Sequence, residues 1–156
     1  RRLIALRPAI RICIVGYGED DAHVQAELGP LAANVTLAGK VAFADMARYY
    51  QRSKVYASTS YYEGLPGTCL EAMAMELPVV VFDFLFYRDL VIPGATGWVA
   101  APNDIDGMAA QVLAALADDA GSRRIGRAAR ARLGSDFSWS KLARRVVDRF
   151  DLGPSA

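Results

Sequence analysis

The chain has 156 residues, of which 53% are hydrophobic and 22% are charged. This composition is typical of a globular protein and unlike that of a disordered chain, and the length suits one domain with a buried core. The net charge of +1 gives no overall field that would favour nucleic acid, and the richest apolar run, Leu77–Phe86, is shorter than the roughly 20 residues that span a membrane.

Short apolar runs alternate along the chain with segments of helical character. In chain order, we expect a strand at 9–16, a helix at 19–28, a strand at 34–39, a helix at 43–53, a strand at 54–60, a helix that begins near Thr68, strands at 78–83 and 97–100, and helices at 104–118, 122–133 and 138–150. Continuous apolar strands separated by helices are typical of a parallel sheet that is covered on both faces. The fold class predicted is therefore α/β, doubly wound and Rossmann-like, with residues 1–150 as a single domain and 151–156 as a loose tail.

Loops that follow strands are the candidate binding segments, because ligands of open parallel sheets bind outside the carboxyl ends of the strands. The loops in question are 16–19, 39–43, 58–68 and 83–89. Gly16, Tyr17 and Gly18 occupy the first of them. Asp21 stands where a dinucleotide fingerprint needs its third glycine, so a plain tight turn and a backbone approach to another ligand both remain open.

Two carboxylates, Glu63 and Glu71, flank a Gly-Leu-Pro-Gly-Thr turn in front of an apolar segment. A helix that begins near Thr68 would direct free N–H groups toward the strand ends, and no acid lies between Gly64 and Leu70, so a phosphate could approach. Two structural alternatives remain open. Thr68 and Glu71 can form a capping box, and Glu63 can be a solvated loop residue.

Other catalytic arrangements receive no support. The single histidine, His23, has no second metal ligand one helical turn away, and neither a P-loop nor a serine nucleophile elbow occurs. We therefore expect no metal and no cofactor. The two cysteines, Cys13 and Cys69, lie singly in apolar segments and are interpreted as buried free thiols, which favours a reducing, cytoplasmic location.

Basic residues dominate the region from 123 to 149, with nine Arg or Lys against two Asp. The simplest interpretation is a solvated surface of the last two helices. The alternative is a surface that contacts an anionic membrane or an acidic partner.

An ordered series of motifs resembles the C-terminal half of a GT-B fold glycosyltransferase of the large retaining group called family 4 or group 1. The series consists of ICIVGYGE (12–19), NVTLAGKV (34–41), ARYYQRSKVYASTS (47–60), YEGLPGTCLEAMAMELPVV (62–80), FYRDLVIPGATGWVAAPND (86–104) and FSWSKLARRV (137–146). The fourth motif is similar to the E-x7-E region of that family.

The resemblance implies a role for each matching residue in binding a nucleoside diphosphate sugar. Glu71 would accept hydrogen bonds from the ribose, and Glu63, the candidate catalytic residue, would contact the donor sugar near the reacting carbon. The remaining binding residues implied are Gly16, Tyr17 and Gly18 beside the nucleotide, Lys40 and Val41 at the base, and Gly64, Leu65, Pro66, Gly67 and Thr68 around the diphosphate.

The reaction implied is metal-independent hexosyl transfer with retention, as in bacterial polysaccharide or glycolipid biosynthesis. The partners implied are the nucleotide sugar, an N-terminal acceptor domain and, by analogy, a membrane at the Arg-rich helices.

We expect the chain to begin after the first strand of the domain and its phosphate-binding Arg/Lys pair, and so to be inactive alone. Phe84–Tyr87 stand where the family commonly has glycines. Alternatives are a non-catalytic nucleotide-binding or assembly module, or a related GT-B enzyme such as a sugar-phosphate synthase or a nucleotide-sugar epimerase.

Overall fold

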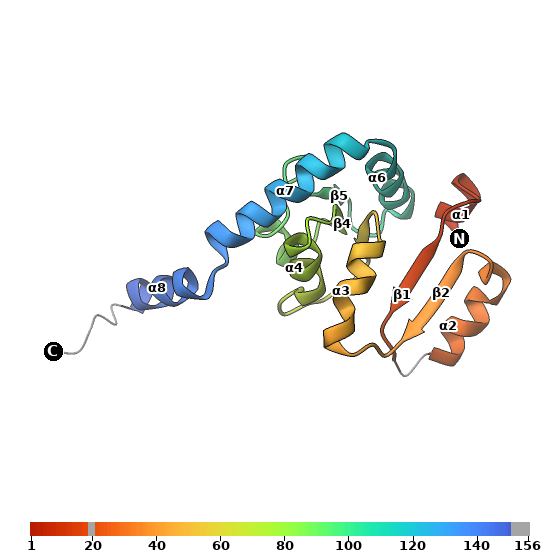
Figure 1. The fold of residues 1–156 in the computed structure, drawn as a ribbon, viewed down its shortest axis with the longest axis horizontal. Helices are drawn as coiled ribbons and strands as arrows, with labels where there is room; N and C mark the ends of the chain where they lie inside the picture. The colour runs from red at the N-terminus through yellow and green to blue at the C-terminus, as the bar shows by residue number, and fades with distance from the viewer. Residues whose placement is uncertain (19–20, 151–156) are drawn as a thin grey trace. The chain divides into compact units, whose positions relative to one another are not determined.

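A computed structural model describes residues 1–18 and 21–150 (Figure 1). The chain divides into two compact units, Arg1–Arg52 and Ser53–Ala156, and each is described by itself. The predicted tail, 151–156, lies outside the described residues, as do Glu19 and Asp20. The grouping of residues 1–150 into one domain stays a prediction.

The first unit contains a two-stranded parallel sheet. Its elements are α1 (Arg2–Leu6), β1 (Ile12–Val15), α2 (Asp21–Leu28), η1 (Gly29–Leu31), β2 (Val35–Gly39) and α3 (Phe43–Arg52). Ile12 of β1 lies opposite Val35 of β2. The Asn34 side-chain amide donates to the carbonyls of Pro8 at 2.7 Å and Ile10 at 2.8 Å, which joins the starts of the two strands.

The prediction that Cys13 is buried is wrong. Cys13 is exposed, and so is its neighbour Ile14, with 40% of its surface accessible. A run of β-branched residues predicts a strand correctly, but two strands alone cover little of either face of a sheet, so apolar side chains of β1 stay accessible. The second cysteine, Cys69, is buried as predicted.

The second unit contains a three-stranded parallel sheet in the order β3-β4-β5. Its elements are β3 (Tyr56–Ser58), α4 (Gly67–Ala74), β4 (Val79–Phe82), α5 (Leu85–Arg88), β5 (Trp98–Ala100), α6 (Ile105–Ala117), α7 (Asp119–Asp136) and α8 (Trp139–Phe150). The predicted class, mixed α/β with parallel sheets and helices on both sides of them, is confirmed. The helices α1 and α5 are additional to the elements expected from the sequence.

The core of the second unit is built on the central strand. All four residues of β4, Val79–Phe82, are at most 1% exposed, and β4 contacts α4 and α6, whose residues Met73 and Val112 are also buried. Because β4 has a neighbouring strand on each edge and helices above it, its continuous apolar run is fully covered.

A close backbone approach joins α7 to the end of α4. A Cβ atom added to the buried Gly126 of α7 would overlap the carbonyl oxygen of Glu76 and lie 2.8 Å from its carbonyl carbon. Glu76 itself has a positive φ of 58°. Only glycine allows the helix to pass this turn at such a short distance.

Side chains of Asp set the starts of α6 and α7. Asp104, the N-cap residue of α6, accepts a hydrogen bond from the Gly107 amide at 2.8 Å, and Asn103 precedes it with a φ of 64°. Asp118 likewise accepts from the Gly121 amide at 2.8 Å, so α7 begins earlier than its periodicity predicted.

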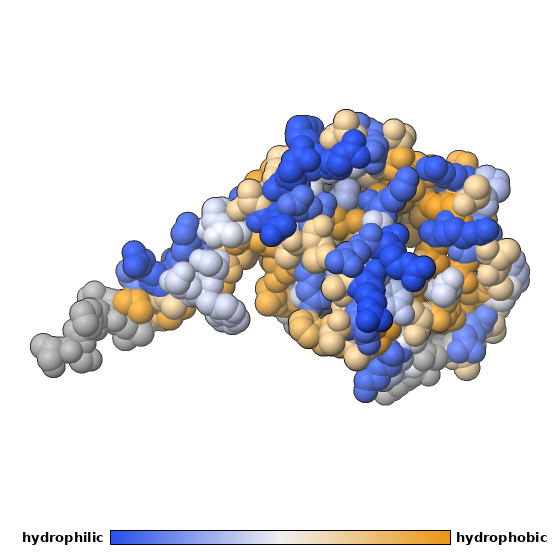
Figure 2. Space-filling model, viewed as in Figure 1, coloured by the Kyte–Doolittle hydropathy of each residue, from blue (hydrophilic) through white to orange (hydrophobic). Residues whose placement is uncertain are grey.

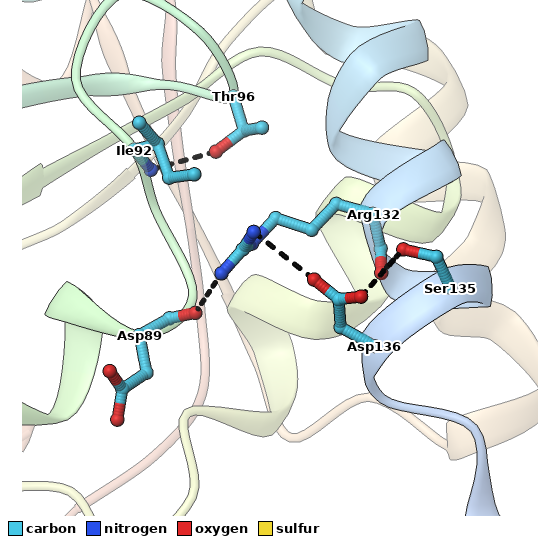
Figure 3. Close-up of polar contacts among 6 residues, drawn as sticks. All are labelled: Asp89, Ile92, Thr96, Arg132, Ser135 and Asp136. Carbon is cyan, nitrogen blue, oxygen red and sulfur yellow. Dashed lines mark hydrogen bonds and ion pairs between the residues drawn. The ribbon is translucent and has the colours of Figure 1, made fainter. Parts of the chain in front are cut away.

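The last turn of α7 is fastened to the residue that follows α5 (Figure 3). Arg132 donates to the Asp89 carbonyl oxygen at 2.9 Å and pairs with the Asp136 carboxylate at 3.1 Å. Ser135 also donates to Asp136, at 2.8 Å. The planar guanidinium thus connects two segments that are 43 residues apart in the sequence.

Hydrophilic side chains gather over α7 on the face shown in Figure 2. The following helix, α8, is amphipathic and has no buried residue. Its exposed apolar residues are Trp139, Val146, Val147 and Phe150. Among the described helices, none combines the length and the apolar character needed to cross a membrane.

Candidate functional site

The loop from β3 to α4 carries the two predicted carboxylates. Glu63 and Glu71 are both half-buried, whereas Gly64, Leu65 and Gly67 between them are exposed. The structure therefore places small, accessible residues at the start of a helix, with one carboxylate on the loop before it and one a turn inside it.

The capping box that was left open as an alternative does not have Thr68 at its N-cap position. The helix α4 starts at Gly67, and the N-cap residue is Pro66, whose side chain makes no capping hydrogen bond. Proline restricts φ to about −65°, which suits it to the entry of a helix, so the helix begins ahead of Thr68. Thr68 lies inside the first turn instead, where its hydroxyl is 2.8 Å from the hydroxyl of Tyr56.

Burial governs the ionisation of the groups packed behind this loop. Burial raises the pKa of the Cys69 thiol to about 12. It also raises the pKa values of Tyr56 and Tyr87, and the charge of Glu63 adds to the rise for both tyrosines. These groups are therefore neutral at physiological pH, and the tyrosines are available as hydrogen-bond donors.

A cavity of about 250 Å³ opens beside the loop. One wall comes from Gly64, Leu65 and Pro66, which the sequence singled out. The opposite wall contains Leu85 and Phe86 of α5. Bulky residues of the segment Phe84–Tyr87 therefore line the same cavity as the loop that follows Glu63. This segment was expected to be a loop, but most of it lies in the short helix α5.

A second cavity, of about 410 Å³, lies at the carboxyl ends of β4 and β5. Its lining includes an ion pair in which Arg88 Nε donates to Asp83 Oδ1 at 2.8 Å. This position falls in the predicted 83–89 loop, but the pairing itself was not predicted. A carboxylate and an arginine five residues apart gave the only signal for it.

In the first unit, the predicted residues meet at the carboxyl ends of β1 and β2. The Gly16 amide donates to the Gly39 carbonyl at 3.0 Å, and both glycines have positive φ, of 136° and 64°. The Lys40 ammonium lies 5.3 Å from the centre of the Tyr17 ring. Two short loops thus hold an aromatic ring against a cation, with the ring 68% exposed.

Each unit therefore brings its own predicted residues together. Gly16, Tyr17 and Gly18 follow β1, and Lys40 with the half-buried Val41 follows β2. That these residues and the loop of Glu63 bind one ligand stays a prediction. Across residues 1–18 and 21–150, no three His, Cys, Asp or Glu side chains cluster in a way that could hold a metal ion.

Sequence reasoning missed the hydroxyl groups behind the loop. Tyr56, Ser58 and Tyr87 lie within the quoted motifs, but no role was assigned to any of the three. The contact between Tyr87 and Ser58 joins residues 29 positions apart, so no local pattern could reveal it.

Comparison with known proteins places the chain in a family. Residues 1–132 match the family described as glycosyl transferases group 1. The chain is 33% identical to glycogen synthase from Mycobacterium tuberculosis over 144 residues, which are 91% of this chain and 35% of that protein. It is 30% identical to phosphatidyl-myo-inositol mannosyltransferase from Mycolicibacterium smegmatis over 148 residues, covering 94% of this chain and 38% of that protein.

A solved structure supports the fold. A variant of TarM from S. aureus, crystallised with fondaparinux, alpha-GlcNAc-glycerol and UDP, superposes with a TM-score of 0.88 over 94% of this chain and 30% of that one, at 23% identity. The chain spans about a third of the length of the curated relatives it matches. Because the family match covers most of its residues, the chain belongs to the group 1 glycosyl transferases.

Proposed function

We propose that the chain binds the nucleoside diphosphate sugar in a retaining, metal-independent glycosyltransferase of family 4 with the GT-B fold. The observation that carries this proposal is the start of α4, where exposed small residues lie between two half-buried carboxylates, Glu63 and Glu71. The names of the relatives, a glycogen synthase and a mannosyltransferase, support sugar transfer. The UDP bound in the TarM crystal supports a nucleotide ligand.

The start of α4 suits a diphosphate for electrostatic reasons. The N-terminus of a helix carries a partial positive charge and N–H groups that point outward, and acidic side chains are absent from residues 64–70. Backbone groups of Pro66, Gly67 and Thr68 would hold the diphosphate there. Donors that are already in position stabilise a leaving diphosphate without reorganisation, which is the role that a metal ion has in other enzymes.

The two carboxylates would act on different parts of the donor. Glu71 would accept hydrogen bonds from the ribose hydroxyls, and Glu63 would lie beside the sugar near the reacting carbon. Gly64 and Leu65 line the cavity next to Glu63 and would border the sugar. In the first unit, Gly16, Tyr17 and Gly18 would lie beside the nucleotide, and Lys40 and Val41 would contact the base.

The acceptor would be held by a separate N-terminal domain, a proposal supported by the chain spanning only 35% and 38% of the length of the two named relatives. We further propose a cytoplasmic location with contact to an anionic membrane through α8. Four basic residues of this helix, Lys141, Arg144, Arg145 and Arg149, accompany its exposed apolar residues, with Asp148 as the acid. A basic amphipathic helix with an exposed Trp is suited to lie in a membrane interface.

Titration with UDP, GDP and ADP, followed by calorimetry, tests nucleotide binding. We expect one nucleotide to bind, and Glu71→Gln to weaken its affinity by about tenfold because an amide oxygen accepts hydrogen bonds less strongly than a carboxylate. Glu76→Gln, the same change at a carboxylate two residues beyond the end of α4 that pairs with Arg130 at 3.1 Å, is the control and is expected to leave the affinity unchanged. If the wild-type chain binds none of the three nucleotides, the proposed donor site is wrong.

Sedimentation with lipid vesicles tests the membrane contact. We expect binding to vesicles that contain phosphatidylserine, no binding to phosphatidylcholine alone, and loss of binding in 1 M salt, where the Debye length falls to about 3 Å. Trp139→Ala is expected to reduce vesicle binding without affecting nucleotide affinity. Equal binding to neutral and anionic vesicles would contradict an electrostatic contact.

A further inference from the structure

The loop that carries Glu63 starts at a chain of hydroxyl groups that leads to α5. The Tyr87 hydroxyl donates to Ser58 Oγ at 2.7 Å, and Ser58 Oγ donates to Ser60 Oγ at 3.3 Å. The Ser60 amide donates back to Ser58 Oγ at 3.4 Å. Ser58 thus links α5 to the residue that opens the loop of Glu63. Only 2% of Tyr87 and 8% of Ser58 are exposed, so the bond between these two residues is shielded from water.

The same loop is attached to α5 a second time, through aromatic rings. Tyr61 lies 5.7 Å from Phe84, and Phe84 stacks on Phe86 at 5.8 Å. Phe86 in turn contacts the Tyr87 ring at 4.6 Å. Ser60, three residues before Glu63, is therefore connected to the segment 84–87 through Ser58, and Tyr61, two residues before Glu63, contacts that segment directly.

The Tyr87 hydroxyl is suited to act as a permanent donor in this arrangement. Burial, with a smaller contribution from the Glu63 charge, raises its pKa, so the hydroxyl keeps its proton across the physiological range. The Glu63 carboxylate is thus close enough to influence Tyr87 electrostatically, although it does not bond to it.

The start of α4 is held by other contacts. The Cys69 and Leu70 amides donate to the Pro66 carbonyl at 3.0 and 3.1 Å, and the Thr68 hydroxyl is bonded to Tyr56. None of these bonds is made to a residue of α5, although Tyr56 also interacts with Ser58. Loss of the Tyr87 hydroxyl is therefore expected to loosen the loop of Glu63 and to leave the first turn of α4 in place.

We propose that Tyr87 is a positioning residue that sets, through Ser58, the conformation of the Glu63 loop and so the affinity for the sugar part of the donor. The inference rests on the proposed function, because it assumes that Glu63 faces the sugar and the start of α4 faces the diphosphate. It assigns to α5, which replaces a glycine segment, a part in recognition of the sugar.

Calorimetry with matched ligand pairs separates the two parts of the donor. The probes are UDP and UDP-glucose, GDP and GDP-mannose, and ADP and ADP-glucose, and the measured quantity is the ratio of the two affinities within a pair. This ratio is the gain in affinity that the sugar provides. We expect Tyr87→Phe to leave the affinity for the nucleoside diphosphate within about twofold. The gain from the sugar is expected to fall at least about fivefold, as loss of one neutral hydrogen bond of about 1 kcal/mol predicts.

Two further variants separate positioning from stability. Ser58→Ala is expected to lose at least as much of the gain from the sugar as Tyr87→Phe, because it removes the bond to Tyr87 and also the bonds to Ser60. The double variant is expected to lose no more than Ser58→Ala alone, because the bond to Tyr87 is already absent there. Ser122→Ala is the matched control, since it removes another buried hydroxyl that donates to the Ala115 carbonyl at 2.6 Å, between α6 and α7. It is expected to lower stability without changing the gain from the sugar.

Hydrogen exchange gives a second readout that needs no ligand. Tyr87→Phe is expected to speed amide exchange in residues 60–66, whereas Ser122→Ala is expected to speed it only in α6 and α7. Unchanged exchange in 60–66, or an unchanged gain from the sugar, overturns the inference. An equal loss of that gain in Ser122→Ala overturns it as well. Failure of the wild type to bind any nucleotide instead refutes the proposed function.

Discussion

Two glycines on one helix, Gly126 and Gly134 of α7, are predicted to respond to the same substitution with opposite signs. A Cβ at Gly126 would overlap the Glu76 carbonyl oxygen, whereas a Cβ at Gly134 has no heavy atom within 4 Å. Replacing glycine by alanine inside a helix stabilises it by about 1 kcal/mol. Forcing an additional methyl group into a close-packed site costs about 1–3 kcal/mol.

The obstacle at Gly126 is backbone, which cannot rotate away as a side chain can, so we take the upper value of about 3 kcal/mol for the clash. After the helix gain of about 1 kcal/mol, Gly126→Ala is expected to lower the free energy of unfolding by about 2 kcal/mol. Gly134→Ala, with the same gain and no clash, is expected to raise it by about 1 kcal/mol. The two variants should thus differ by about 3 kcal/mol.

Urea unfolding followed by far-UV circular dichroism measures both values. The two variants are compared only if the slope of the free energy of unfolding against urea concentration is unchanged, because a changed slope would indicate a change in the unfolded state or in cooperativity. A stabilised Gly126→Ala variant would refute the close approach of α7 to the end of α4. A destabilised Gly134→Ala variant would show that the open space around this position does not decide the sign of the change in the free energy of unfolding.

Three further predictions concern stability. Asp104→Ala is expected to lower the free energy of unfolding by about 1 kcal/mol, measured by thermal or urea unfolding, because the α6 cap is lost. Asp104→Asn is expected to retain most of the wild-type stability, and equal losses of stability in the two variants would contradict the capping role. Cys69, whose pKa rises from 9.0 to about 12, contributes stability that is complete below pH 9 and is lost as the pH rises to about 12. This loss amounts to about 4 kcal/mol, so the stability of Cys69→Ala is expected to fall less steeply over that range, and parallel pH profiles would exclude this linkage. Arg132→Lys is expected to destabilise the protein nearly as much as Arg132→Ala, by about 1–2 kcal/mol. One ammonium group cannot replace the guanidinium, whose two terminal nitrogens reach the Asp89 carbonyl and the Asp136 carboxylate. Wild-type stability of Arg132→Lys would contradict this reasoning.

Local chemistry explains which elements were predictable. Val79–Phe82 form a strand because a β-branched apolar run suits a covered parallel sheet, and Asp104 starts α6 because its carboxylate reaches the Gly107 amide three residues later. Gly16 was singled out as a glycine between a strand and a helix, and its φ of 136° is one that L side chains rarely adopt. In each case, the signal lies within a few residues of the sequence.

Local chemistry misled where several partners compete. Thr68 and Glu71 have the spacing of a capping box, but Pro66 starts the helix earlier, and the Thr68 hydroxyl bonds to Tyr56, twelve residues away. Cys13 looked buried because its neighbours are apolar, yet burial depends on what covers the strand and not on the strand itself. A sequence pattern shows that a group can make a contact but does not show which contact it makes.

The sequence by itself determined the alternation of strands and helices, the parallel sheets that follow from it, and the loop in which Glu63 and Glu71 flank a small-residue turn. These depend on periodicity, on turn residues and on helix signals, all of which act over short distances along the chain. Only the tertiary structure decided that Tyr87 bonds to Ser58, that α7 passes Glu76 at Gly126, and that residues of α5 line a cavity together with the loop of Glu63. Such contacts join distant segments, and the packing of the whole unit selects them from many pairings that the sequence permits equally well.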